Sequence, residues 1–133
     1  ASEGNVGMFG KVFGADAVIF SVIDEWKKKG FGIETKITYL VKSTRTNEVL
    51  FDRTCDLYLD LSDNNYYGGG LVGSLANLAV SAINTALTDH IVAARNCNQY
   101  IFADIPQGKY RAEHMQDQET PARDKNISAT VKK

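Results

Sequence analysis

The chain has 133 residues, of which 44% are hydrophobic and 23% charged, and its 15 basic and 16 acidic side chains leave a formal net charge of -1. This length accommodates one domain with one core, and the composition is that of an ordinary globular protein, not of a disordered or fibrous one. So small a net charge provides no field that would collect a phosphate backbone or an anionic lipid surface, so we expect no nucleic acid partner. We expect one domain over residues 1–116 and a polar, flexible tail over residues 117–133.

The first expected element is a short helix over residues 5–13, ended by Gly14, because glycine commonly follows the last turn of a helix. The next run, Ala15–Trp26, is apolar on both faces over its central part, Val18–Ile23. Such a pattern is typical of a strand that is covered on both sides and lies inside a sheet.

Two further strands are expected, one from Ile33 to Lys42 and one from Val49 to Asp60. In both runs apolar and polar residues alternate, the period of two expected of a half-exposed strand. Glycines and lysines between residues 27 and 32 suit a hairpin connection between the first two strands. Together the three strands predict an antiparallel meander.

The longest helical pattern runs from about Leu71 to Arg95 and follows a glycine-rich loop. No formal charge occurs between Asp63 and Asp89, yet uncharged polar residues recur at spacings of three and four and form a stripe. A transmembrane helix is disfavoured by two asparagines and three hydroxyls within the run. The stripe then faces either water or another protein surface, and we favour the second. The expected fold class is α+β, a three-stranded antiparallel meander packed against a long helix.

The residues expected at a protein contact are those of the glycine-rich loop and the polar stripe, with one tryptophan, a residue type enriched at interfaces. They are Gly68, Gly69, Gly70, Ser74, Asn77, Ser81, Asn84 and Trp26. For Trp26, ordinary packing at the edge of the core is the other interpretation, and the one that we favour. A different kind of function, small-ligand binding, would use a pocket between meander and helix, near Tyr39, Tyr58 and Trp26.

No motif for catalysis or cofactor binding occurs in the sequence. GxSxG, HExxH and GxGxxG are absent, and the glycine-rich loop lacks the lysine of a phosphate-binding loop. His90 and His114 have no second ligand at a suitable spacing. Cys55 and Cys97 have no CxxC spacing, which leaves buried thiols and a disulfide both open. We therefore expect no enzymatic activity, no cofactor and no metal.

Several segments occur in an order that resembles a known family. These are Phe13–Phe20, Asp24–Trp26, the glycine-rich loop with the helix to Arg95, and Pro106–Tyr110. Their order resembles that of small Gram-negative lipoproteins of unknown function, typified by a neisserial vaccine-candidate surface lipoprotein. The genes of this family tend to accompany that of a CsgG-type secretion lipoprotein. The resemblance covers residues 10–114.

The resemblance implies a location at the periplasmic face of the outer membrane or the cell surface, and a mixed sheet with helices like the N-terminal domain of TolB. Family members would begin with a lipobox cysteine and an α/β half, whereas this chain begins at Ala1. We therefore expect that a preceding segment has been removed and that any membrane attachment runs through a lipid anchor outside this chain. The family has no established catalytic residues.

The expected function is accordingly that of a non-catalytic assembly or secretion accessory. It would act through protein contacts, either by self-association or with a CsgG-like lipoprotein docked on the helix and the glycine-rich loop. A small-ligand-binding periplasmic domain is the alternative.

Overall fold

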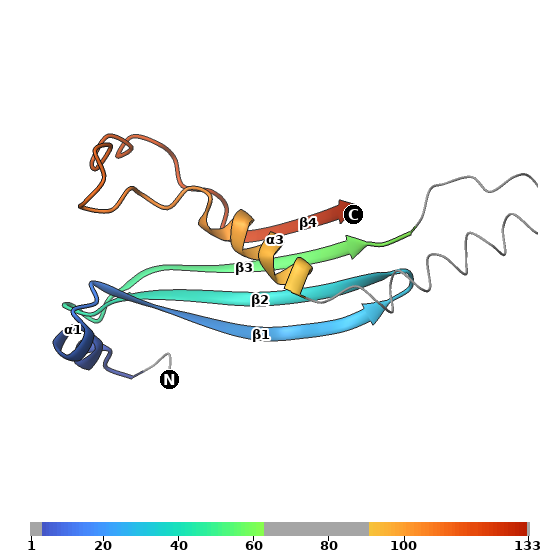
Figure 1. Cartoon of the computed structure of the whole chain (residues 1–133), viewed down its shortest axis with the longest axis horizontal. Coiled ribbons are helices and arrows are strands. Elements are labelled where there is room, and N and C mark those ends of the chain that lie inside the picture. Colours follow the sequence, from blue (N-terminus) through green and yellow to red (C-terminus); the bar gives the residue numbers. More distant parts are fainter. Residues whose placement is uncertain (1–3, 63–90, 133) are drawn as a thin grey trace, which may run out of the picture.

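A computed structural model of the chain describes residues 4–62 and 91–132. These residues form a four-stranded sheet with one helix across one face and another helix at one end (Figure 1). The elements in chain order are α1 (Gly7–Phe13), β1 (Ala17–Lys29), β2 (Gly32–Ser43), β3 (Val49–Asp60), α3 (Ile91–Phe102) and β4 (Asn126–Lys132). The α+β class is confirmed.

The first three strands form the antiparallel meander that the sequence predicts. β1 and β2 are joined by a two-residue turn between Lys29 and Gly32. Gly30, at its first position, has φ +58°, a value that two-residue hairpin turns need and that glycine adopts without strain. The predicted end of the first helix is also confirmed, because α1 is capped by Gly14 in the left-handed conformation.

The fourth strand corrects the expected three-stranded antiparallel sheet. β4 runs parallel to β3, with Asn126 opposite Thr54 and Lys132 opposite Asp60, so the sheet is mixed. α3 lies between these two strands in the chain and belongs to the crossover that parallel pairing requires. β4 falls inside the segment 117–133, which we expected to be a flexible tail. Its apolar pattern is short and weak, consisting of Ile127, Ala129 and Val131.

The end of the helix expected over residues 71–95 lies further along the chain than expected. Residues 63–90 lie outside the described part of the chain, and most of the expected helix lies there with them. The described part has only two short helices, and α3 continues beyond residue 95 to Phe102. Asn96 lies inside the helix, and its side-chain amide donates a hydrogen bond to the Val92 carbonyl, one turn earlier, at 2.9 Å.

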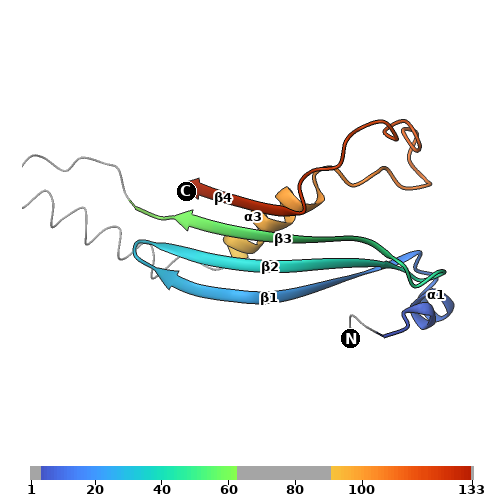
Figure 2. The same ribbon diagram turned by 180° about the vertical axis from the view of Figure 1, so that it is seen from behind.

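The hydrophobic core lies between α3 and one face of the sheet, which we call the α3 face. We call the opposite side of the sheet, seen in Figure 2, the open face. α3 contacts β3 and, less extensively, β2, so β1 lies beyond its main cover (Figure 1). The buried residues of this core are Ile33, Ile37, Tyr39, Cys55, Leu57, Leu59, Leu61, Ala93, Cys97 and Ile101.

The two cysteines meet in this core. Cys55 on β3 and Cys97 on α3 are free thiols with fully buried side chains. A hydrogen bond to Cys55, and then burial, raise the pKa of the Cys97 thiol. Of the two alternatives left open by the sequence, the structure shows the buried thiols, with Cys97 protonated at neutral pH.

An ion pair fastens the end of α3 to β3. Both terminal nitrogens of Arg53 donate to the carboxylate of Asp104, one of them at 3.0 Å, and one also donates to the Ile101 carbonyl at 2.8 Å. Asp104 further accepts a hydrogen bond from the backbone N–H of Arg123 at 2.8 Å. The pair thus links β3, the end of α3 and the segment that leads into β4.

Candidate contact surface

Of the residues expected at a protein contact, Trp26 is the one that falls in the described ranges. The others, Gly68, Gly69, Gly70, Ser74, Asn77, Ser81 and Asn84, lie outside them. Trp26 is half-buried on β1, opposite Thr35, and packs against the hydrophobic core. Its packing is therefore the edge-of-core arrangement that we favour from the sequence.

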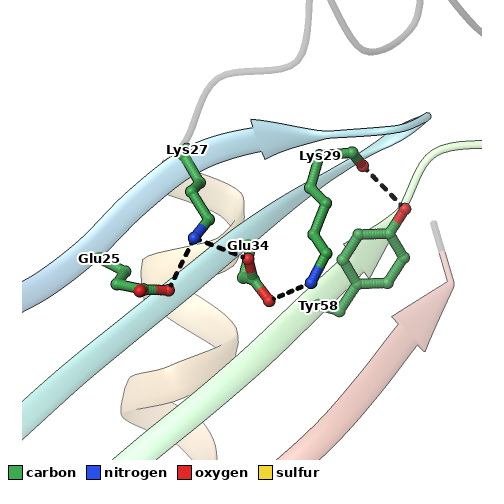
Figure 3. Close-up of polar contacts among 5 residues, drawn as sticks. All are labelled: Glu25, Lys27, Lys29, Glu34 and Tyr58. Atoms are coloured by element: carbon green, nitrogen blue, oxygen red, sulfur yellow. Dashed lines mark hydrogen bonds and ion pairs between the residues drawn. The ribbon is translucent and has the colours of Figure 1, made fainter.

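The side chains expected to line a ligand pocket do not converge. Tyr39 is buried on the α3 face, where its hydroxyl donates to Asn98 Oδ1 at 2.7 Å. Tyr58 lies beside Glu34 on the open face, and its hydroxyl donates to the Lys29 carbonyl at 3.0 Å (Figure 3). Since the sheet separates Tyr39 from Tyr58, no pocket is formed by both of them.

β1 is an outer strand of the sheet, which corrects its expected position inside it. Within residues 4–62 and 91–132, β2 is the one strand that pairs with β1. The apolar side chains that the sequence suggested were covered are instead exposed, with Ile19 at 52%, Val22 at 53% and Ile23 at 55%. A pattern that is apolar on both faces shows that a strand suits burial, but it does not show that the same chain supplies the cover.

The backbone of β1 presents regularly spaced polar groups at its outer edge. The Thr44 N–H donates to the Asp16 carbonyl at 3.1 Å, so the backbone N–H and C=O of Asp16 face β2. In an antiparallel pair, consecutive residues alternate between facing the partner strand and facing away from it. The residues of β1 before its bulge whose N–H and C=O face outward are therefore Ala17, Ile19, Ser21 and Ile23.

These outward-facing backbone N–H and C=O groups lie in the segment Ala17–Ile23, which has no charged residue and no proline. We call it the β1 edge. Unpaired strand edges are usually protected by charged side chains, prolines or short length, because they otherwise pair with other chains. The β1 edge has none of these protections over its seven residues.

The opposite edge of the sheet is protected. β4 has 7 residues against 13 in β1, and it lies between Lys125, which pairs with Asp52 at 2.6 Å, and Lys132 at its end. Short length and flanking lysines are common devices that discourage strand pairing. The two edges of one sheet thus differ in how readily they would accept another strand.

The second half of β1 is also protected, by an exposed cluster of charges (Figure 3). Lys27 contacts both Glu25 and Glu34 at 3.2 Å, and Lys29 contacts Glu34 at 2.7 Å. Hydrogen bonds from Lys29 and then Lys27 lower the pKa of Glu34. A β-bulge between Ile23 and Glu25 separates this half from the first. The part of β1 that lacks protection against strand pairing is therefore the β1 edge.

A shallow hollow lies beside the β1 edge on the open face. It has a volume of about 240 Å³, and Phe20, Val22, Thr38 and Leu40 are among its lining residues. Its wall next to β1 is apolar. A side chain of a strand added at the β1 edge would therefore meet apolar surface on the open face as well as on the α3 face.

Among the described residues, neither α1 nor α3 is long and apolar enough to cross a membrane. The same residues hold no group of three or more histidine, cysteine or acidic side chains suited to a metal ion.

Comparison with known proteins shows similarity to solved structures but to no family model. No family model matches the chain, and no curated protein matches it. Among solved structures, the crystal structure of lipoprotein GNA1162 from Neisseria meningitidis is similar, with 20% sequence identity and a TM-score of 0.39. The match covers 65% of this chain and 58% of that one, so it spans less than two thirds of that chain.

Proposed function

We propose that this chain is a non-catalytic module of the Gram-negative cell envelope, an assembly or secretion accessory that acts through protein contacts. The contact is made by addition of a strand from another polypeptide to the β1 edge. The observation that supports this most strongly is the exposure of Ile19, Val22 and Ile23, each more than half accessible, on an outer strand with unprotected backbone groups.

Strand addition explains both features of the β1 edge. In this mode of recognition, backbone hydrogen bonds to the added strand supply affinity, while alternating side chains select the partner. Removing the remaining exposed surface of Ile19, Val22 and Ile23 from water would contribute roughly 1 kcal/mol for each side chain, about half the value for complete burial. A single added strand would form hydrogen bonds with the outward-facing backbone groups of β1 and would also cover its exposed apolar side chains.

The location at the periplasmic face of the outer membrane or at the cell surface is inferred from the family resemblance of the sequence. A CsgG-like lipoprotein is the partner that the same resemblance implies, and self-association is the other possibility. Any membrane attachment would run through a lipid anchor outside this chain.

Amide hydrogen exchange tests whether the β1 edge is available. In dilute solution we expect the amides of Ile19, Ser21 and Ile23 to exchange much faster than those of Val18, Phe20 and Val22, because only the second set donates to β2. Residue-resolved exchange measured by NMR gives the comparison. β2 is an internal control, since it pairs on both sides and its amides should all be slow.

The opposite result would be equal protection of all six β1 amides in the monomer. It would mean that another part of the same chain already covers the edge, and the proposed contact would then be wrong.

A further inference from the structure

We infer that the strand added at the β1 edge is β1 of a second copy of this chain, antiparallel to the first and related to it by a two-fold axis at Ser21. This inference rests on the proposed function, because it requires an available β1 edge. It names the partner and the register of pairing.

The charges at the two ends of β1 favour antiparallel pairing. Asp16 immediately precedes the strand, and Lys27, Lys28 and Lys29 end it. Two antiparallel copies place Asp16, which pairs with Lys109 of its own chain at 2.8 Å, toward the lysines at the end of the other strand. Parallel copies would instead place the lysine ends of both strands together, and like charges that face each other across a strand pair are destabilising.

Neighbouring two-fold registers pair β1 less well. A register centred on Phe20 places Asp16 of one copy opposite Asp24 of the other, two like charges. A register centred on Val22 places Phe20 opposite Asp24, an aromatic ring beside a carboxylate that already accepts a hydrogen bond from Thr38 Oγ1 at 2.7 Å. An axis at Ser21 avoids both pairs and places Val18 opposite Asp24, at the β-bulge where regular pairing ends.

Over residues 19–23, the register centred on Ser21 pairs apolar residues with apolar residues and serine with serine. On the α3 face, Ile19 of each copy lies opposite Ile23 of the other, and the small Ser21 side chains meet at the axis. On the open face, Phe20 of each copy lies opposite Val22 of the other, beside the apolar wall of the hollow. Ser21, Ile19 and Ile23 all have outward backbone groups, so each of these pairs can exchange two hydrogen bonds.

The resulting assembly is a continuous sheet across two chains, with the protected β4 strands at its outer edges. A closed two-fold arrangement of this kind uses one surface patch on both copies and stops at the dimer. The contact involves only the first half of β1, so its area is below that of a standard interface, about 800 Å² for each partner. We therefore expect the dimer to form reversibly and at high concentration.

Single-cysteine cross-linking tests the partner and the register together. In a hydrogen-bonded antiparallel pair, opposite Cα atoms lie about 5.5 Å apart, a distance that a disulfide can span. We expect the variant Ser21→Cys to yield a disulfide-linked dimer under mild oxidation, measured by non-reducing electrophoresis and intact mass. Phe20→Cys and Val22→Cys are matched controls, because in this register their copies are offset by two residues and lie too far apart. Wild type is a further control, since Cys55 and Cys97 are buried.

Cross-linking through Phe20→Cys or Val22→Cys, with little through Ser21→Cys, would overturn the register. If none of the three variants cross-links above the wild-type level at any concentration, self-pairing is wrong. Fast exchange of the Ile19 and Ser21 amides in that case would leave the β1 edge available and point to a different partner, whereas protected amides would overturn the proposed function as well.

Discussion

Replacing Asp104 by alanine is expected to lower the free energy of unfolding by about 3 kcal/mol, the low end of the range for breaking a buried ion pair. The side chains of Arg53 and Asp104 are only 9% and 12% exposed. Without Asp104, the guanidinium of Arg53 keeps its bond to the Ile101 carbonyl but loses its counter-charge, and the Arg123 N–H loses its acceptor. Chemical denaturation followed by circular dichroism measures the change.

Asp56→Ala is the matched control, because Asp56 is an exposed carboxylate on the same strand. Surface substitutions of this kind usually change stability by less than about 0.5 kcal/mol. An Asp104→Ala variant that is as stable as Asp56→Ala would show that the ion pair does not fasten α3 to β3.

The effect of Asp104 should also depend on pH. The hydrogen bond from Arg53 lowers the pKa of Asp104 to about 2, against about 3.9 for an aspartate in an unfolded chain. The folded state therefore favours the ionised carboxylate, and this contribution is complete above about pH 5 and is lost as the pH falls from about 4 to 2. The difference in unfolding free energy between wild type and Asp104→Ala should shrink over that window, and a constant difference would contradict this account.

Leu57→Ala is expected to destabilise the fold by about 3 kcal/mol, within the range for truncating a buried leucine. Leu57 is 0% exposed and lies on β3 beneath α3, so its removal leaves a cavity that the sheet and helix cannot easily close. Ile23→Ala on β1 should cost less than about 1 kcal/mol, since Ile23 is 55% exposed in the monomer. Thermal or urea unfolding at low protein concentration measures both changes.

This pair of variants separates the residues that stabilise the fold from those of the β1 edge. A loss at Ile23 as large as that at Leu57 would show that Ile23 is buried in the monomer, and the β1 edge would then belong to the core.

Local sequence signals predicted local structure well. Gly14 marks the end of α1 because a left-handed residue is needed there, and the two-residue turn at Gly30 joins β1 and β2 for a similar reason. The alternating pattern of β2 matches the faces that it shows to α3 and to solvent. Each of these features depends on residues close together in the chain, so the sequence alone was enough.

Features that depend on distant residues were harder to predict. β4 has only Ile127, Ala129 and Val131 as a signal, and its place beside β3 depends on the path of the chain through α3. The position of β1 was predicted wrongly because its two apolar faces indicate only that cover is favourable. The absence of charges in Ala17–Ile23 can be read from the sequence, but the solvent accessibility of these residues cannot. Most of the expected contact residues, from Gly68 to Asn84, fall outside the described part of the chain.

The most direct test of the contact at the β1 edge is the solution mass of the chain at increasing concentration, measured by light scattering for wild type, Ile19→Lys and Thr130→Lys. Lysine at position 19 places a charge in the proposed pair, whereas Thr130 lies on the protected β4 edge. We expect the mass of wild type and Thr130→Lys to rise from 14.6 kDa toward twice that value, and that of Ile19→Lys to stay at 14.6 kDa. Association of Ile19→Lys equal to that of wild type, or a wild type that remains a single chain throughout, would contradict the self-pairing of β1.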